Sequence, residues 1–132
     1  MTQTILIIDD NPDDVEITKM ALARIDRGLK VEIAQRGEIA LEFLRSGKSL
    51  PSLILLDLKM PGMSGFDTLR IIRADKLMKH IPVIIVTSSS LEADKKMGYE
   101  TGADGFLHKA FDIDQFERDL KSMLERWLHK PD

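Results

Sequence analysis

A chain of 132 residues is about one domain's worth, large enough to bury roughly two-thirds of the surface that its unfolded form exposes. Hydrophobic residues make up 43% and charged residues 31%, and the net charge of −3 argues against an electrostatic grip on nucleic acid or membrane. The absence of cysteine rules out disulfides and thiolate metal sites. We therefore expect a single domain over 1–132.

The start of the chain, MTQTILIID, has no basic n-region, and its apolar run is too short for a signal peptide. No later stretch approaches the roughly 18 consecutive apolar residues that a membrane-spanning helix needs. These features predict a cytoplasmic protein.

Five short runs rich in Ile, Leu and Val recur along the chain and predict β-strands. Three of them are nearly continuous in apolar residues, which is typical of strands buried on both faces of a parallel sheet. The second run alternates and indicates an edge strand. In chain order the runs are TILIID (4–9), KVEIA (30–34), SLILLDL (52–58), PVIIVT (82–87) and GFLH (105–108).

Helical patterns separate these runs. The first has Asn11 as N-cap and Pro12 at the first helical position, with Asp13 and Asp14 in the first turn, where carboxylates suit the helix dipole. Apolar residues then recur at helical spacing until Gly28 offers a stop. Three shorter or weaker helical patterns and one clear final stripe follow: Ala40, Leu41 and Leu44 up to Gly47; Phe66, Leu69 and Ile72; 91–102; and Ile113, Phe116, Leu120, Leu124 and Trp127.

Five strands alternating with five helices predict an α/β fold with a parallel sheet and helices on both faces, because parallel neighbours need crossover connections. For a domain this small the expected strand order is 2-1-3-4-5, the flavodoxin-like arrangement. Ligands of such sheets bind beyond the carboxyl ends of the strands, between the first and third strands.

Chemically active side chains stand at the predicted strand ends. Asp9 and Asp10 end the first strand, Asp57 the third, Thr87 the fourth, and Lys109 follows the fifth. Crowded carboxylates must share a proton, raise a pKa or bind a cation, and hard oxygen ligands favour Mg2+.

A bound Mg2+ commonly brings a phosphoryl group into its shell. Asp57 is then placed as a nucleophile that forms an acyl phosphate. We expect Lys109 and Thr87 to contact the phosphoryl oxygens, the lysine as a positive charge and the threonine as a hydrogen-bond donor. In this interpretation Asp9 and Asp10 hold the metal.

Four segments in order resemble the receiver domain of bacterial two-component response regulators, especially the single-domain type typified by the chemotaxis receiver. The segments are LIIDDN, LILLDLKMPGMSG, PVIIVTSSS and GADGFLHKAF, and they cover 5–111. The resemblance implies that Asp57 accepts a phosphoryl group from a histidine kinase or phosphotransfer protein. It also implies Mg2+ bound through Asp9, Asp10, Asp57 and the carbonyl of Lys59.

The resemblance further implies a switch, in which Thr87 moves toward the phosphate and Phe106 reorients. The face made of the fourth helix, fifth strand and fifth helix would then change its affinity for an unknown downstream protein. Such a phosphoprotein acts in phosphorelay signal transduction and catalyses only its own phosphotransfer and slow dephosphorylation. Phosphorylation would leave it a monomer or promote a dimer.

Two positions depart from the family pattern. Ala110 stands where the family usually has a proline that often follows a cis bond, and a cis bond costs roughly 2.5–4 kcal/mol without proline. We therefore expect a trans bond between Lys109 and Ala110. Lys59, two residues beyond the acceptor, flanks the path of an attacking water, so we expect its charge to alter the lifetime of the acyl phosphate.

Three other functions share parts of this pattern. A flavodoxin needs hydroxyl and glycine donors after the first strand, where this chain has acids that would repel a flavin phosphate. An aspartyl-phosphate phosphatase shares the strand-end Asp, but such enzymes resemble one another in a second Asp two residues on, where Lys59 stands here. A receiver-like scaffold that binds partners without phosphorylation stays open. His108, next to Lys109, is expected to be a surface residue on the side of Phe106.

Overall fold

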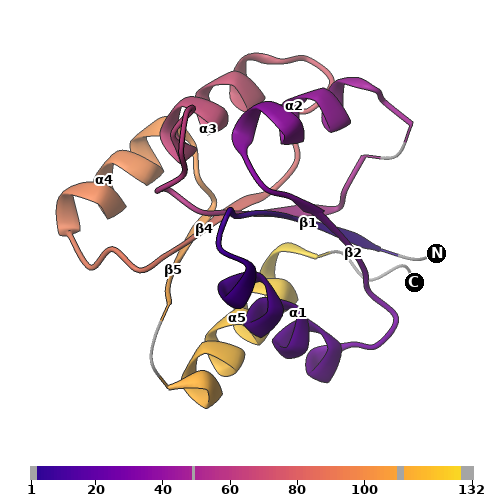
Figure 1. Cartoon of the computed structure of the whole chain (residues 1–132), viewed down its shortest axis with the longest axis vertical. Coiled ribbons are helices and arrows are strands. Elements are labelled where there is room, and N and C mark those ends of the chain that lie inside the picture. The colour runs from indigo at the N-terminus through magenta and orange to yellow at the C-terminus, as the bar shows by residue number, and fades with distance from the viewer. Residues whose placement is uncertain (1–2, 49, 110–111, 129–132) are drawn as a thin grey trace.

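The computed structural model describes residues 3–48, 50–109 and 112–128, in which five strands and five helices alternate (Figure 1). None of the helices in this part of the chain is both long and apolar enough to cross a bilayer. The elements are β1 (Thr4–Ile8), α1 (Pro12–Ile25), β2 (Lys30–Ala34), α2 (Gly37–Arg45), β3 (Leu53–Leu56), α3 (Gly65–Ala74), β4 (Val83–Thr87), α4 (Glu92–Thr101), β5 (Gly105–His108) and α5 (Ile113–Trp127).

The strands form one sheet in the order β2-β1-β3-β4-β5, and every neighbouring pair is parallel. The predicted flavodoxin-like order is therefore confirmed. In the register, Ile8 at the end of β1 is level with Ala34 on β2 and Leu56 on β3. The carboxyl ends of the three strands consequently meet at one edge of the sheet.

Helices cover both faces of the sheet, with α1 and α5 on one side and α2, α3 and α4 on the other (Figure 1). Along β1, Ile5 and Ile7 join the core beneath α1 and α5, whereas Leu6 and Ile8 join the opposite core. This alternation explains the unbroken apolar run, since both faces of β1 are buried. The edge strand β2 is only partly buried, and its Ile33 is 42% exposed.

The first helix begins as predicted. The side chain of Asn11 accepts hydrogen bonds from the backbone N–H groups of Asp13 and Asp14, and Pro12 is the first helical residue. The helix ends at Ile25, earlier than the Gly28 stop that the sequence suggests. The difference arises because the next residue, Asp26, leaves the helical conformation, and its carboxylate accepts the N–H of Gly28 in a local turn.

The predicted stripe of α5 is buried at its centre, where Phe116, Leu120 and Leu124 pack against β-strands and α1, while Ile113 at its start is 49% exposed. The weakest predicted helix, α4, is present and has a single buried residue, Gly98. A Cβ on that glycine would lie 2.6 Å from the Ile85 side chain, so α4 approaches the sheet closely there.

Arg73, in the last turn of α3, joins three segments at the amino edge of the sheet. Its Nε donates to the carbonyl of Gly102 at 2.8 Å, and its Nη1 donates to the carbonyls of Lys79 and Ile81 at 2.9 and 2.8 Å. Its Nη2 forms a 2.8 Å ion pair with Asp104. We call this group of bonds the Arg73 network. Because Gly102 caps α4 in the left-handed conformation (φ 119°), the network fixes the C-terminal end of that helix.

Candidate functional site

Backbone hydrogen bonds hold the strand-end residues in place. Asp9, Asp57 and Lys109 each donate one bond of the sheet type just beyond the last residue of their strands. Their side chains are therefore fixed to a rigid scaffold at the carboxyl edge of the sheet. The bonds run from Asp9 N to Ala34 O (3.1 Å), from Asp57 N to Ile8 O (2.9 Å) and from Lys109 N to Thr87 O (2.7 Å).

Three carboxylates gather at this edge, as the sequence predicts. Each of Asp9, Asp10 and Asp57 offers an oxygen that lies within 4.8 Å of the oxygens offered by the other two. Asp9 and Asp57 are buried, whereas Asp10 faces solvent. Asp9 Oδ1 accepts the backbone N–H of Asn11 at 3.0 Å, which orients the carboxylate.

The ammonium group of Lys109 lies among these acids, and its side chain is only 14% exposed. The Nζ atom donates hydrogen bonds of 2.9 Å to Asp9 Oδ2 and of 2.9 Å to Asp14 Oδ2. It lies 3.6 Å from Asp57 Oδ2. The predicted approach of Lys109 to Asp57 is thus found, together with a partner, Asp14, that was assigned only to the helix dipole.

A sequence signal for Asp14 exists. Asp14 stands four residues before Thr18 and eight before Leu22, both of which are buried, so it lies on the inner face of α1. Asp13 lies off this stripe and is exposed. The helical spacing could therefore have separated the two neighbouring acids, one turned toward the site and the other toward water.

The electrostatic balance of the site leaves it short of positive charge. Burial raises the pKa of Asp57 to about 6; the Lys109 charge opposes the shift, and the Asp9 charge adds to it. Burial alone would lower the pKa of Lys109, but its hydrogen bonds to Asp9 and Asp14, with the nearby charge of Asp57, raise it. One ammonium does not offset the acids around it. Oxygen donors gathered within 4.8 Å with an anionic surplus fit a divalent cation.

The segment after Asp57 shapes the site through its backbone. The N–H groups of Leu58 and Lys59 donate hydrogen bonds to the Asp57 carboxylate, and the Lys59 side chain is exposed. Gly65, the first residue of α3, packs so closely that a Cβ there would collide with the Asp57 carbonyl oxygen. Its N–H also donates to the Leu58 carbonyl at 3.0 Å. Helix α3 thereby fixes the position of the Asp57 backbone.

Thr87 is fully buried at the end of β4 and is linked to α4. Its Oγ1 accepts the N–H of Ser89 at 3.2 Å. The Ser89 hydroxyl donates to Asp94 Oδ2 in α4 at 2.6 Å and accepts the N–H of Leu91 at 3.3 Å. No local sequence signal marks Ser89 or Asp94, because Leu91 is the N-cap residue of α4 and no side chain caps the helix there.

Phe106 on β5 is half-buried and packs against the core beneath α2, α3 and α4. It also borders a surface hollow of about 240 Å³ between α4 and β5. His108 is exposed, as expected, and its Nε2 lies 3.1 Å from the carbonyl oxygen of Ser88. The hollow is lined by Ser89, Ser90, Leu91, Glu92, Lys95, Phe106 and His108.

The expected trans bond between Lys109 and Ala110 involves a residue outside the described part of the chain. Its configuration therefore stays a prediction. The Lys109 backbone itself is held by its bond to Thr87, and its side chain is held by the acids.

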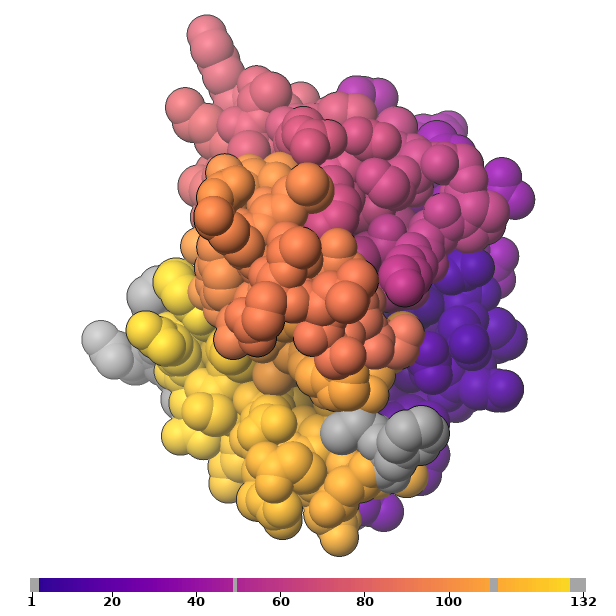
Figure 2. All heavy atoms as spheres, turned by 90° about the vertical axis from the view of Figure 1, so that its left-hand side faces the viewer, coloured from indigo at the N-terminus to yellow at the C-terminus, as the bar shows by residue number. Residues whose placement is uncertain are grey.

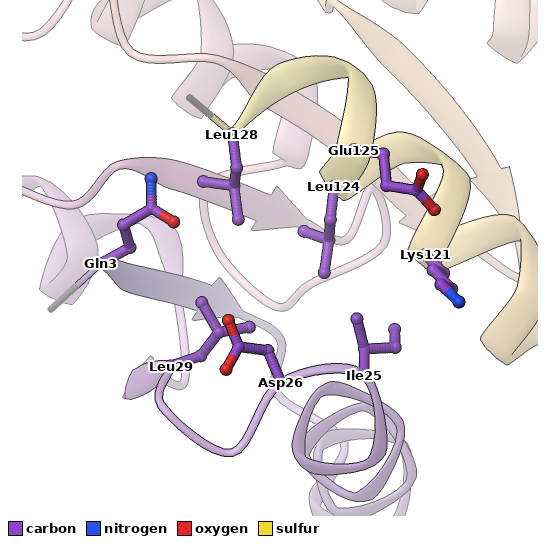
Figure 3. Close-up of a pocket in the computed structure, with 8 residues that line it drawn as sticks. All are labelled: Gln3, Ile25, Asp26, Leu29, Lys121, Leu124, Glu125 and Leu128. Atoms are coloured by element: carbon purple, nitrogen blue, oxygen red, sulfur yellow. The ribbon is translucent and has the colours of Figure 1, made fainter. Parts of the chain in front are cut away.

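A second cavity, of about 460 Å³, lies far from these residues, between the C-terminal ends of α1 and α5 (Figure 3). Apolar side chains of Leu29, Leu124 and Leu128 face it, and it holds none of the strand-end residues described above. Its lining consists of Gln3, Ile25, Asp26, Leu29, Lys121, Leu124, Glu125 and Leu128.

Comparison with known proteins gives a consistent result. A family model described as "Response regulator receiver domain" matches residues 5–121. The chain is 32% identical over 123 residues to response regulator Rre1 of Synechocystis sp., covering 93% of this chain and 52% of Rre1. It is 29% identical over 128 residues to the probable methanogenesis regulatory protein FilR2 of Methanothrix harundinacea, covering 94% of this chain and 83% of FilR2. The chain thus spans about half the length of Rre1.

Solved structures match nearly the whole chain. The phosphorylated cyanobacterial phytochrome response regulator RcpA superposes with a TM-score of 0.88 at 29% identity, covering 96% of this chain and 94% of RcpA. The Mn2+-bound form of response regulator Rcp1 gives 0.84 at 27%, with coverages of 98% and 97%. The chemotaxis protein CheY4 of Vibrio cholerae gives 0.80 at 28%, with coverages of 97% and 100%.

Proposed function

The chain belongs to the response regulator receiver domain family of two-component systems, and on this premise we propose that it accepts a phosphoryl group on Asp57. Receiver domains interact with histidine kinases and downstream effectors. The observation that supports Asp57 most strongly is its environment: a buried carboxylate, within 4.8 Å of two further acids and 3.6 Å from the Lys109 ammonium. A nucleophile and the charges that stabilise its product are thus in one place.

In the proposed reaction, a carboxylate oxygen of Asp57 attacks the phosphorus of a phosphohistidine on a histidine kinase or phosphotransfer protein. The new bond is O–P, the P–N bond to the histidine breaks, and the imidazole nitrogen takes the bonding electrons and then a proton from solvent. Lys109, whose ammonium lies 3.6 Å from this carboxylate, would compensate the charge of about −1.5 to −2 that a phosphoryl group adds.

We propose Mg2+ as the cofactor, held by the side chains of Asp9, Asp10 and Asp57 and by the carbonyl of Lys59. The raised pKa of Asp57 supports this, because burial disfavours the charged carboxylate and the Lys109 charge alone does not offset that cost. The Mn2+-bound form of Rcp1 shows that a structurally similar protein takes a divalent metal. The cation would supply charge stabilisation for the transferred group.

We propose that the output is a change at the face formed by α4, β5 and α5, which Figure 2 shows with α4 in orange above α5 in yellow. Two features support this. The Thr87 hydroxyl is hydrogen-bonded to Ser89, so its movement toward a phosphate would break a link to α4. Phe106 borders a hollow beside α4, which gives the ring space to reorient.

We propose two partners, a histidine kinase or phosphotransfer protein and an unidentified downstream protein. The protein would bind them as a monomer or as a dimer that phosphorylation promotes. The chain would act as a cytoplasmic regulator without turnover on other substrates. Lys59 in place of a second acid supports slow hydrolysis of the acyl phosphate. Equal dephosphorylation rates in the wild type and Lys59→Ala would show that its charge does not affect the lifetime.

The deciding experiment is intact-mass spectrometry after incubation with acetyl phosphate, with and without Mg2+. We expect an adduct of one phosphoryl group that needs Mg2+ and is absent in Asp57→Asn. An adduct that persists in Asp57→Asn would place the acceptor elsewhere. The absence of an adduct with acetyl phosphate, phosphoramidate and a phosphorylated kinase would instead favour a scaffold that binds partners without phosphorylation.

A further inference from the structure

Lys109 has two carboxylate partners of equal distance in this protein. Its Nζ lies 2.9 Å from Asp9 Oδ2 and 2.9 Å from Asp14 Oδ2, and Asp57 Oδ2 lies farther away at 3.6 Å. A lysine ammonium has three N–H donors. Two of them are thus used by Asp9 and Asp14, and the third is left on the side of Asp57.

The two partners differ in what else they contact. Asp9 belongs to the acidic cluster with Asp10 and Asp57, and its other oxygen accepts the Asn11 N–H. Asp14 is outside that cluster among the described residues, and its carboxylate is 34% exposed. Its carboxylate accepts a hydrogen bond from Lys109 at 2.9 Å. The carboxylate of Asp14 therefore pairs with the lysine without belonging to the acidic cluster.

Asp14 is also held in place from both sides of its backbone. Its N–H donates to the Asn11 side chain at 3.2 Å, and its carbonyl accepts the Thr18 hydroxyl at 2.9 Å. Pro12 fixes the start of the helix two residues earlier. A short side chain on such a fixed backbone can hold a long one in position, because Lys109 carries a flexible four-carbon stem.

We propose that Asp14 is a positioning residue for Lys109, which keeps the ammonium beside Asp57 independently of Asp9. The inference rests on the proposed phosphoryl transfer to Asp57 and adds to it a residue that acts only through the lysine. The two acids would then have different roles, Asp9 in the acidic cluster and Asp14 in holding Lys109. If a cation in the cluster drew the oxygens of Asp9 away from Lys109, the bond to Asp14 would keep the ammonium near Asp57.

The chain offers a matched control in Asp13. It lies in the same first turn of α1, carries the same charge and is exposed. Asp13→Asn removes that charge from the helix N-terminus without removing a contact to Lys109. Any effect that Asp14→Asn has beyond Asp13→Asn therefore reports the pairing with the lysine rather than the helix dipole.

The first experiment measures urea unfolding midpoints of Asp14→Asn in the wild-type and Lys109→Met backgrounds, in EDTA and again in Mg2+. We expect Asp14→Asn to lower the midpoint more where Lys109 is present than in Lys109→Met, where only the helix-dipole effect that Asp13→Asn also shows should remain, in both solutions. The same midpoint shift in both backgrounds would overturn the proposal. The unfolding midpoints require no phosphorylation, so they test the pairing of Asp14 with Lys109 even if the proposed function fails.

The second experiment follows the rate of phosphorylation by acetyl phosphate as Mg2+ is raised. We expect the plateau rate of Asp14→Asn to fall roughly tenfold, because Lys109 is no longer held in position, while that of Asp13→Asn changes by less than about twofold. The Mg2+ concentration for half-maximal rate should shift equally in the two variants. Asp14→Glu should recover part of the plateau rate. A plateau equal to that of Asp13→Asn would refute the assignment, whereas an inert wild type would refute the proposed function instead.

Discussion

Two cationic side chains, Arg73 and Lys109, connect distant segments at opposite edges of the sheet, and their surroundings differ. At the amino edge, Arg73 meets one carboxylate and three backbone carbonyls, so its donors are matched by acceptors that carry a single negative charge. At the carboxyl edge, Lys109 faces the carboxylates of Asp9, Asp14 and Asp57. The first network is neutral, whereas the second has an excess of negative charge.

The difference separates a group that stabilises the fold from one that is arranged for a ligand. Charge left uncompensated in a buried place costs stability, and such costs cluster at functional sites. The raised pKa of Asp57 expresses that cost. The molecule therefore combines a stable amino edge with a carboxyl edge that an added cation would stabilise.

The largest expected change in the free energy of unfolding comes from breaking the Arg73 network. Arg73→Ala would leave Asp104 and the carbonyls of Gly102, Lys79 and Ile81 without this partner and should lower the free energy of unfolding by about 3–4 kcal/mol. Urea denaturation measures it. Arg70→Ala is the control, because Arg70 forms an exposed ion pair with Asp67 of the kind that contributes about 0–1 kcal/mol. Similar losses in both variants would mean that the network is no more stabilising than a surface pair.

At the carboxyl edge of the sheet we expect a substitution to increase the free energy of unfolding rather than lower it. Asp57→Asn removes the uncompensated carboxylate and should raise the free energy of unfolding of the metal-free protein by up to about 3 kcal/mol near neutral pH. The measurement is urea denaturation in EDTA. A destabilising effect of Asp57→Asn under these conditions would contradict the picture of a site short of positive charge.

The pH dependence follows from the direction of the Asp57 shift. A carboxyl whose pKa rises from 3.8 to about 6 on folding binds its proton more tightly in the folded state. Its cost to stability is therefore absent below about pH 4, grows as the pH rises toward 6, and is constant above that. The difference between Asp57→Asn and the wild type should develop over the same interval, as unfolding series at pH 4, 5, 6 and 7.5 can establish.

A smaller effect is expected where α4 meets the carboxyl edge. Asp94→Ala removes the acceptor of the Ser89 hydroxyl and should cost about 1 kcal/mol, confined to the first turn of α4. Amide hydrogen exchange would detect it as faster exchange at the start of α4, with unchanged protection at the end that Arg73 fixes. Uniformly faster exchange along the helix would show that its two ends are not held separately.

Most of the fold followed from the sequence because its patterns are local. The alternation of apolar runs and helical stripes predicted the strand order, and the bounds of β2, β5 and the helix Ile113–Trp127 agree with the structure. The end of α1 was misplaced because a side chain–backbone turn at Asp26 ends the helix before Gly28. Such a turn competes with the helix locally and leaves no periodic signal.

The candidate site was predictable to the extent that strand ends in a parallel sheet meet at one edge. That rule placed Asp9, Asp10, Asp57 and Lys109 together, as found. It could not show that Lys109 would bond to Asp14, because that contact joins residues 95 positions apart through a helix face. The Arg73 network escaped prediction for the same reason, since three of its acceptors are backbone carbonyls, which every residue carries.

The unequal attachment of α4 has a mechanical consequence. Its C-terminal end is fixed by Arg73 through Gly102, whereas its start is held by the Ser89 side chain beside the hollow at Phe106. A tilt of α4 would therefore turn about its fixed C-terminal end, with Gly102 as the pivot. A helix of its length spans about 15 Å at 1.5 Å per residue. A small tilt would displace Leu91, which is 61% exposed, far more than Thr101. A protein that docks near Leu91 would experience the largest displacement, and one that docks near the pivot would experience almost none.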